Sequence, residues 1–136
     1  MSSATLAQQQ KSLTSVDQIC PEARGLHMLV KVISISATAE RVRPTTGQVL
    51  VVSEVVVGDK TGISCFTARG QDQVSALKVG CVMELRNAKV EMFRNSFMRI
   101  VVDKWGSIIY PPTVKFDEDQ FTVDDSNDVS KRNTSL

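Results

Sequence analysis

The chain has 136 residues, of which 42% are hydrophobic, and its formal net charge is +1. This length suits one domain with one hydrophobic core, and no apolar run reaches the roughly 18 residues that a membrane-spanning helix requires. Three cysteines without CxxC spacing and one histidine argue against a disulfide framework or a zinc site, and no P-loop or GxGxxG motif is present. We therefore expect an intracellular domain of the nucleus or cytoplasm with no metal, cofactor or membrane contact.

The charges divide the chain unevenly. Residues 113–136 hold six acidic and three basic residues, whereas residues 1–112 hold nine acidic and 13 basic ones. A basic body fits a protein that neutralises nucleic-acid phosphates, although an ordinary solvated surface can have the same balance.

Composition also predicts three segments. Residues 1–22 are polar and rich in Gln and Ser, which is typical of a flexible arm. Residues 23–112 carry the regular patterns of a folded domain. Residues 113–136 are acidic and lose the pattern, so we expect a mobile C-terminal tail.

The first half of the folded segment predicts two strands. Residues 27–36 and 49–57 are rich in β-branched side chains, as strands are. Residues 37–48 have no helical apolar stripe and contain turn residues, so we expect a loop there. This loop carries Arg41 and Arg43.

The second half predicts a hairpin, a short helix and two more strands. The glycine-flanked turn at residues 58–62 leads into a third strand at 63–67. Residues 72–80 have helical spacing and end in glycine, and strands follow at 81–92 and 97–103.

Side-chain alternation in the last strand places Met98, Ile100 and Val102 on one face, the expected core face. Five strands with one short helix between the third and fourth are the order of the OB-fold, an all-β, partly open Greek-key barrel. Ligands of this fold bind across strands 2 and 3, between the loops that join strands 1 to 2 and 4 to 5.

Four stretches carry a family resemblance: LVKVISIS, VGDKTGISCFTAR, LKVGCVMELRNAKVEMF and MRIVVDKWGSI. Over residues 24–110 the chain resembles a family of small plant and algal proteins that have a single OB domain and are related to single-stranded DNA-binding proteins. It is more distantly similar to the DNA-binding component of the human sensor-of-ssDNA complex and to archaeal single-stranded binding proteins.

The resemblance implies that bases stack on aromatic rings while basic side chains guide the phosphates. Phe66 lies where better-studied relatives have a stacking tryptophan. Phe93 matches an aromatic residue of their strand 4 to strand 5 hairpin. Those relatives also have tyrosines on strands 4 and 5, where this chain has Ala88 or Lys89 and Val101.

The residues of the second hairpin form the best candidate constellation. Phe93, Arg94, Phe97 and Arg99 combine rings with guanidinium groups, which can hold a base and its phosphate together. Phe93 could instead fill the mouth of the barrel, and Phe97 favours packing.

Further basic residues complete the predicted nucleic-acid site: Arg41, Arg43, Arg69, Arg86 and Lys89. Arg86 and Lys89 could equally be ordinary solvated residues. Trp105 favours a structural role, sealing one end of the barrel.

The sequence thus predicts a monomeric, non-enzymatic protein that binds single-stranded nucleic acid, DNA rather than RNA, with little sequence preference. The alternative is an adaptor subunit that docks protein partners within a larger complex. We also expect the acidic tail to compete with nucleic acid for the basic face.

Overall fold

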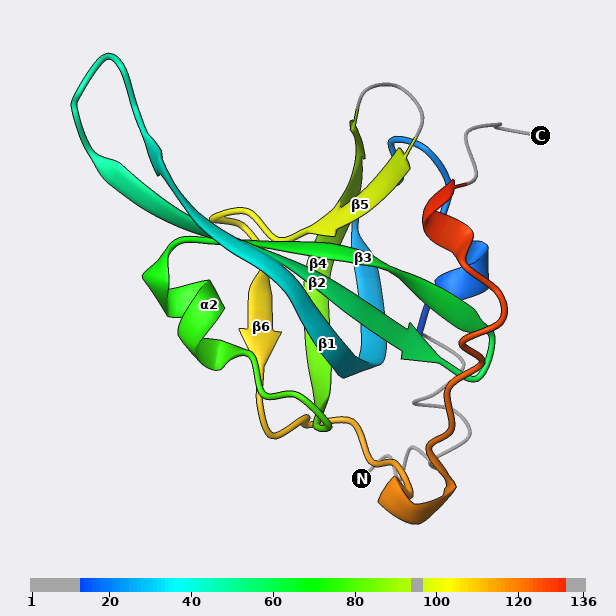
Figure 1. Cartoon of the computed structure of the whole chain (residues 1–136). Helices are drawn as coiled ribbons and strands as arrows, with labels where there is room; N and C mark the ends of the chain where they lie inside the picture. Colours follow the sequence, from blue (N-terminus) through cyan, green and yellow to red (C-terminus); the bar gives the residue numbers. More distant parts are fainter. Residues whose placement is uncertain (1–12, 94–96, 132–136) are drawn as a thin grey trace.

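The computed structural model of the chain describes residues 13–93 and 97–131 (Figure 1). Its strands are β1 (Leu26–Val42), β2 (Val49–Asp59), β3 (Gly62–Arg69), β4 (Val82–Phe93), β5 (Phe97–Val101) and β6 (Ser107–Ile109). The helical segments are η1 (Val16–Gln18), α2 (Gln71–Ala76), η2 (Glu118–Gln120) and η3 (Val129–Lys131). Among the described residues, no helix combines the length and the apolar character needed to cross a membrane.

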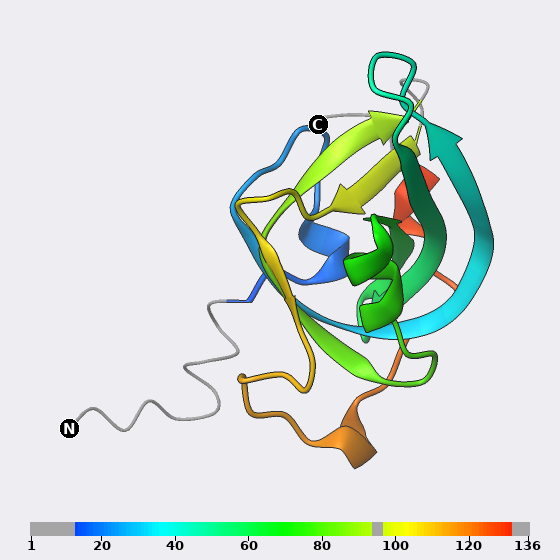
Figure 2. The same cartoon turned by 90° about the vertical axis from the view of Figure 1, so that its left-hand side faces the viewer.

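The strands form one sheet that closes on itself. Their order is β1-β2-β3-β5-β4-β6, and β1 also pairs with β4 through contacts such as Met28 with Leu85. All pairings are antiparallel except that of β3 with β5. Figure 2 shows the resulting ring, with α2 in front of its opening in this view. This confirms the predicted OB-fold with its short helix between the third and fourth strands.

The core lies inside this ring. Met98, Ile100 and Val102 are all buried, which confirms the predicted core face of β5 and of the residue that follows it. From β2 and β3, Val55 and Phe66 are completely buried beside them. Because successive side chains of a strand point to opposite sides, the residues between these core positions point outward.

The loop predicted at residues 37–48 is shorter in the structure, because residues 37–42 belong to β1 and only residues 43–48 lie between the strands. β1 continues to Val42 and pairs with β2 as far as Val49, so that only a short turn joins them. The resulting hairpin stands away from the body (Figure 1). The alternation of apolar and polar residues did not reveal this extension of β1, because alternation arises only where one side of a strand is buried. Residues 34–49 are exposed on both sides of the ribbon.

Both terminal segments contribute to the core where the structure describes them. Val16 and Ile19 come from the predicted arm, and Val114 and Val129 come from the predicted tail. The tail also hydrogen-bonds β3, where the Ile63 amide donates to a main-chain carbonyl of residue 127 at 2.8 Å. Each segment places isolated apolar residues within polar sequence, a pattern too sparse to predict packing.

Candidate nucleic-acid interface

The register of four neighbouring strands gathers charged side chains on one outward surface. Directly paired residues lie on the same side of a sheet. Glu54 pairs with Thr67, Cys65 with Arg99, and Arg99 with Glu91. We call this surface the β3–β5 face, and it comprises Glu54, Cys65, Thr67, Arg69, Lys89, Glu91 and Arg99.

Glu54 lies at the centre of the β3–β5 face. Its carboxylate forms an ion pair with the Arg99 guanidinium and accepts a hydrogen bond from the Thr67 hydroxyl at 3.0 Å. The Cys65 thiol donates to the same oxygen at 3.4 Å. Burial raises the pKa of this thiol to about 11, so it stays protonated and unreactive near neutral pH.

A second charged group lies beside the first. Arg69 donates two N–H groups to the Glu91 carboxylate, at 2.7 and 3.4 Å. The Lys89 ammonium is 3.5 Å from Glu91 and 3.3 Å from Asp103, which follows β5. The hydrogen bond from Arg69 holds the pKa of Glu91 below its usual value. Each of the three cations of the face therefore has a carboxylate partner.

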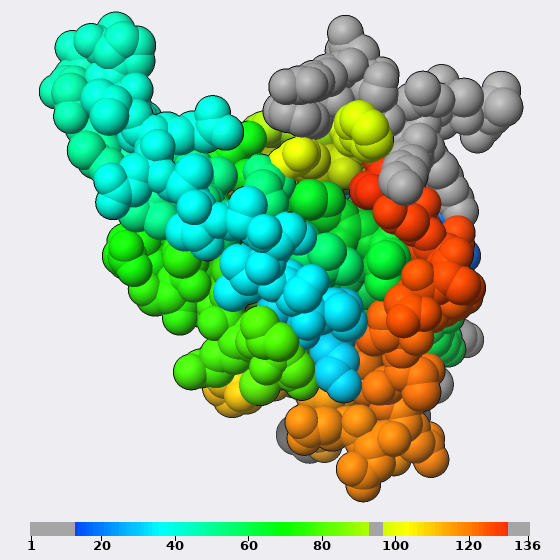
Figure 3. Space-filling view, viewed as in Figure 1, coloured from blue at the N-terminus to red at the C-terminus, as the bar shows by residue number. Residues whose placement is uncertain are grey.

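The β1–β2 hairpin adds cations of a different kind. Arg41 pairs with Leu50 of β2, so the two side chains lie on the same side of the ribbon. Leu50 and Glu54 are four residues apart on β2, and this even spacing places Arg41, Leu50 and Glu54 on the outward side. Arg43 begins the turn. Both arginines are exposed, and within the described part of the chain neither has an ion pair or a side-chain hydrogen bond. In Figure 3 the hairpin projects well clear of the surface beside it.

The β4–β5 hairpin lies at the other border of the face. Phe97 pairs with Phe93 beside its turn, and Phe97 is 41% exposed. This exposure leaves the ring accessible, contrary to the expected packing role. The Phe93 side chain and the whole of Arg94 lie outside the described residues.

The structure removes Phe66 from the predicted nucleic-acid site. Its ring is completely buried and points inward opposite Val55 and Ile100, so no base can stack on it. Ser64 shares its inward side, whereas Cys65 points outward. The polarity of Ser64 and Cys65 therefore does not indicate which side of β3 faces the core.

Arg86 is a second residue that the structure separates from the face. It precedes the positive-φ residue Asn87, where the pairing of β1 with β4 shifts register. Its guanidinium pairs at 2.6 Å with Glu84 and donates at 2.9 Å to the Thr113 hydroxyl. Arg86 therefore holds the tail against β4, on the half of the strand that pairs with β1 and β6.

The Glu84 carboxylate is the centre of that structural cluster. It is completely buried and accepts hydrogen bonds from Arg86, from His27 at 2.6 Å and from the amide and hydroxyl of Thr113, both at 2.8 Å. Burial alone would raise the pKa of Glu84, but these hydrogen bonds outweigh it and lower that pKa to about 2. Sequence reasoning missed this group because its members are far apart in the chain.

Trp105 does not seal the barrel as predicted. Its side chain is 73% exposed, on the turn between β5 and β6. The amide of Trp105 donates to the Asp103 carboxylate at 2.9 Å, and Asp103 in turn pairs with Lys89 of the face. The backbone that carries the exposed indole is therefore linked to the β3–β5 face through the side chains of Asp103 and Lys89.

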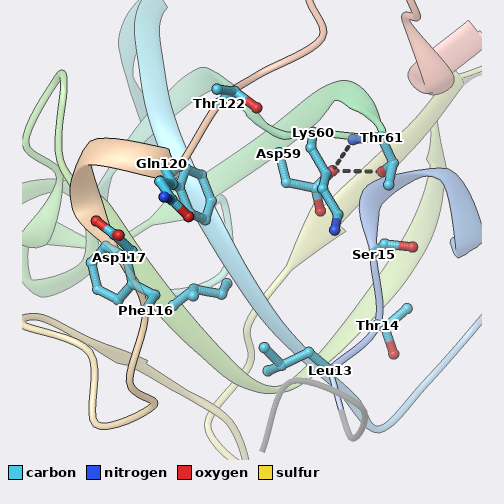
Figure 4. Close-up of a pocket in the computed structure, with 12 residues that line it drawn as sticks. Leu13, Thr14, Ser15, Asp59, Lys60, Thr61, Phe116, Asp117, Gln120 and Thr122 are labelled. Atoms are coloured by element: carbon cyan, nitrogen blue, oxygen red, sulfur yellow. Dashed lines mark hydrogen bonds between the residues drawn. The ribbon is translucent and has the colours of Figure 1, made fainter. Parts of the chain in front are cut away.

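A separate cavity of about 370 Å³ lies where the two terminal segments meet the β2–β3 turn. In Figure 4, Thr14 and Ser15 line one side, Phe116 and Gln120 the other, and Lys60 lies at the turn. None of the predicted nucleic-acid residues lines this cavity.

The closed sheet, the paired charges and the two bordering hairpins define an OB-fold domain with an open outer face. Residues 19–110 match the family model described as single-stranded DNA binding protein Ssb-like, OB fold. The chain belongs to this Ssb-like family of OB-fold proteins.

Individual relatives agree with this assignment. An uncharacterised protein of Arabidopsis thaliana is 35% identical over 123 residues, covering 85% of this chain and 76% of that protein. A solution structure of a hypothetical Arabidopsis protein has 34% identity and a TM-score of 0.69, covering 87% of this chain and 82% of its own.

An archaeal structure shares the fold alone. The second OB-fold domain of replication protein A from Methanococcus maripaludis has 18% identity and a TM-score of 0.56. The match covers 73% of this chain and 96% of that domain.

Proposed function

We propose that this protein binds single-stranded nucleic acid, DNA in preference to RNA, across the β3–β5 face and catalyses no reaction. The observation that carries the proposal is the register that sets Arg69, Lys89 and Arg99 on one outward surface between two hairpins. Membership of the Ssb-like family supports nucleic acid as the ligand class.

The cations of the face must exchange partners when a strand binds. Exposed ion pairs contribute only about 0–1 kcal/mol, so phosphates can replace their carboxylates at small cost. Arg69 and Lys89 belong to this class, with side chains 45% and 32% exposed. Arg99 is 21% exposed and pairs with a Glu54 that is 26% exposed, so its exchange costs more.

The hairpin arginines complete the binding surface without such an exchange. Arg41 and Arg43 can meet phosphates directly, and Phe97 can stack on a base. Because few exposed rings border the face, electrostatics supplies most of the affinity. Binding should therefore weaken steeply as salt increases and depend little on base sequence.

Fluorescence anisotropy of a labelled oligo-dT and an oligo-U of equal length tests this function. We expect binding at low salt, a linear fall of the logarithm of affinity with the logarithm of salt concentration, and tighter binding of the DNA. A control variant is Lys78→Gln, which removes a basic residue of the α2–β4 connection, outside the face. Its affinity should equal that of the wild-type protein. The proposal fails if neither strand binds at low salt.

A protein-docking adaptor is a second candidate, and the cavity beside the β2–β3 turn favours it. Apolar side chains of Leu13, Leu29 and Phe121 line this cavity together with polar ones. Affinity purification after nuclease treatment distinguishes the candidates. Partners that survive nuclease and are lost with Phe121→Ala support the adaptor, whereas loss of every partner on nuclease treatment counts against it.

A further inference from the structure

The turn between β5 and β6 presents an unusual side chain to solvent. Trp105 is the only tryptophan of the chain, and 73% of its side chain is exposed. Large aromatic side chains are strongly buried on average, because exposing an apolar ring to water costs free energy. A tryptophan left in solvent therefore suggests a binding role, provided that its position is fixed.

The backbone beneath Trp105 is fixed by three hydrogen bonds. The amide of Trp105 donates to the Asp103 carboxylate at 2.9 Å, and the Asn87 side-chain amide donates to the carbonyl of Trp105 at 3.0 Å. The amide of Gly106 donates to the carbonyl of Asp103, also at 3.0 Å.

Gly106 presses the turn directly against β4. A Cβ at this position would lie 2.7 Å from the carbonyl oxygen of Arg86 and 2.8 Å from that of Asn87, so only glycine allows so close an approach. The indole thus projects from a turn that is tied to the barrel wall, and little conformational entropy is lost when a ligand stacks on it.

The surroundings of the ring are suited to an anionic ligand with a flat group. The Lys104 ammonium is 5.1 Å from the centre of the Trp105 ring, within the range of a cation–π contact. The Asp103 carboxylate, which caps the turn, is 3.3 Å from the Lys89 ammonium of the β3–β5 face. A ring, a cation beside it and a side-chain connection to the face therefore occur together.

From this arrangement we propose that Trp105 is a base-stacking platform that extends the nucleic-acid path beyond the end of β5, with Lys104 contacting the adjacent phosphate. Phe97 begins β5 and Trp105 follows its end, so the two exposed rings lie at opposite ends of this strand. Four residue steps at about 3.3 Å each separate Phe97 from Val101 by roughly 13 Å, room for more than one base between the rings. This inference rests on the proposed function, because it assigns a further subsite to the same ligand.

Intrinsic fluorescence of the wild-type protein provides the first test, since its tryptophan signal comes from Trp105 alone. Titration with unlabelled oligo-dT should quench this fluorescence, with the same midpoint that anisotropy gives for the labelled strand. A strand that binds by anisotropy and leaves the tryptophan emission unchanged would overturn the inference while the proposed function stands. Absence of any anisotropy change would instead remove the proposed function itself.

Substitution provides the second test. Trp105→Ala should weaken oligo-dT binding about tenfold, the effect of losing one stacked base, and Trp105→Phe should retain most of the affinity. The matched control is Val79→Ala, which removes another exposed apolar side chain, 58% exposed, from the α2–β4 connection and should leave affinity unchanged. Equal affinity of Trp105→Ala and wild type would overturn the inference. Denaturation midpoints confirm that the variants compared are equally folded.

Discussion

Two carboxylates of this barrel have the same kinds of partner and different surroundings. Glu84 accepts hydrogen bonds from an arginine, a histidine and a threonine, and it is completely buried. Glu54 also pairs with an arginine and a threonine, but on the open β3–β5 face, where its side chain is 26% exposed. Burial therefore decides whether such a cluster fixes the fold or can exchange its partners with a ligand.

Removing each carboxylate should separate the two roles most clearly. Glu84→Gln should lower the free energy of unfolding by about 3 kcal/mol, because breaking a buried ion pair leaves charged partners uncompensated. Glu54→Gln, the matched control, should cost only about 1 kcal/mol, the upper end of the range for exposed pairs. Urea denaturation at neutral pH measures both, and equal losses would contradict the distinction.

The contribution of Glu84 to stability should depend on pH. The pKa of Glu84 falls from 4.5 to about 2 on folding, so its ionised form stabilises the fold above pH 4.5. That contribution, about 3 kcal/mol, should disappear progressively as the pH falls from 4.5 toward 2. Denaturation of wild type and Glu84→Gln across this window should give converging stabilities. A constant difference would show that ionisation of Glu84 is not the cause.

Basic residues with and without a carboxylate partner should differ in their contribution to binding. Replacing both Arg41 and Arg43 by Gln should weaken oligo-dT binding about tenfold, because glutamine cannot neutralise a phosphate and the change releases no internal partner. Arg69→Gln should weaken it less, since Arg69 must first leave Glu91. For single strands the salt slope should fall by about 0.7 for each phosphate that is no longer neutralised. A larger effect from Arg69 would reverse this order.

The smallest expected effect is a gain of affinity. Glu54→Gln should tighten oligo-dT binding about threefold, because Arg99 no longer exchanges a carboxylate for a phosphate. Glu40→Gln is the control, since it removes one negative charge from an exposed position of the hairpin. Equal gains from both variants would trace the effect to net charge rather than to release of Arg99.

Much of the fold followed from the sequence. The strand order, the short helix and the core positions Met98, Ile100 and Val102 could be predicted because β-branched runs, turn glycines and alternation are local signals. The orientation of Phe66 could not, since Ser64 is buried and Cys65 points outward, against the usual polarity. The carboxylate partners of Arg69 and Arg99 could not be predicted either, because they depend on the register between strands, which no single segment encodes.

The terminal segments show a further limit of sequence reasoning. A tail that supplies Val114 and Val129 to the core is part of the fold. The Asn127 carbonyl also accepts a hydrogen bond from the Ile63 amide of β3. Deleting residues 113–136 would therefore expose the core as well as remove acidic charge. Substitution of the exposed Asp117 and Asp119 by Asn is the cleaner test of the expected competition for the basic face.

The β1–β2 hairpin has one more consequence. Beyond Val51, whose carbonyl accepts a hydrogen bond from the Gly70 amide, no third strand of the described structure pairs with either strand of the hairpin. A lone two-stranded ribbon is marginally stable, so its tip can bend while the Thr38–Ser53 hydroxyl bond of 2.9 Å keeps its base in place. Bending of this tip toward the β3–β5 face would therefore lengthen the time for which a nucleic-acid strand stays bound.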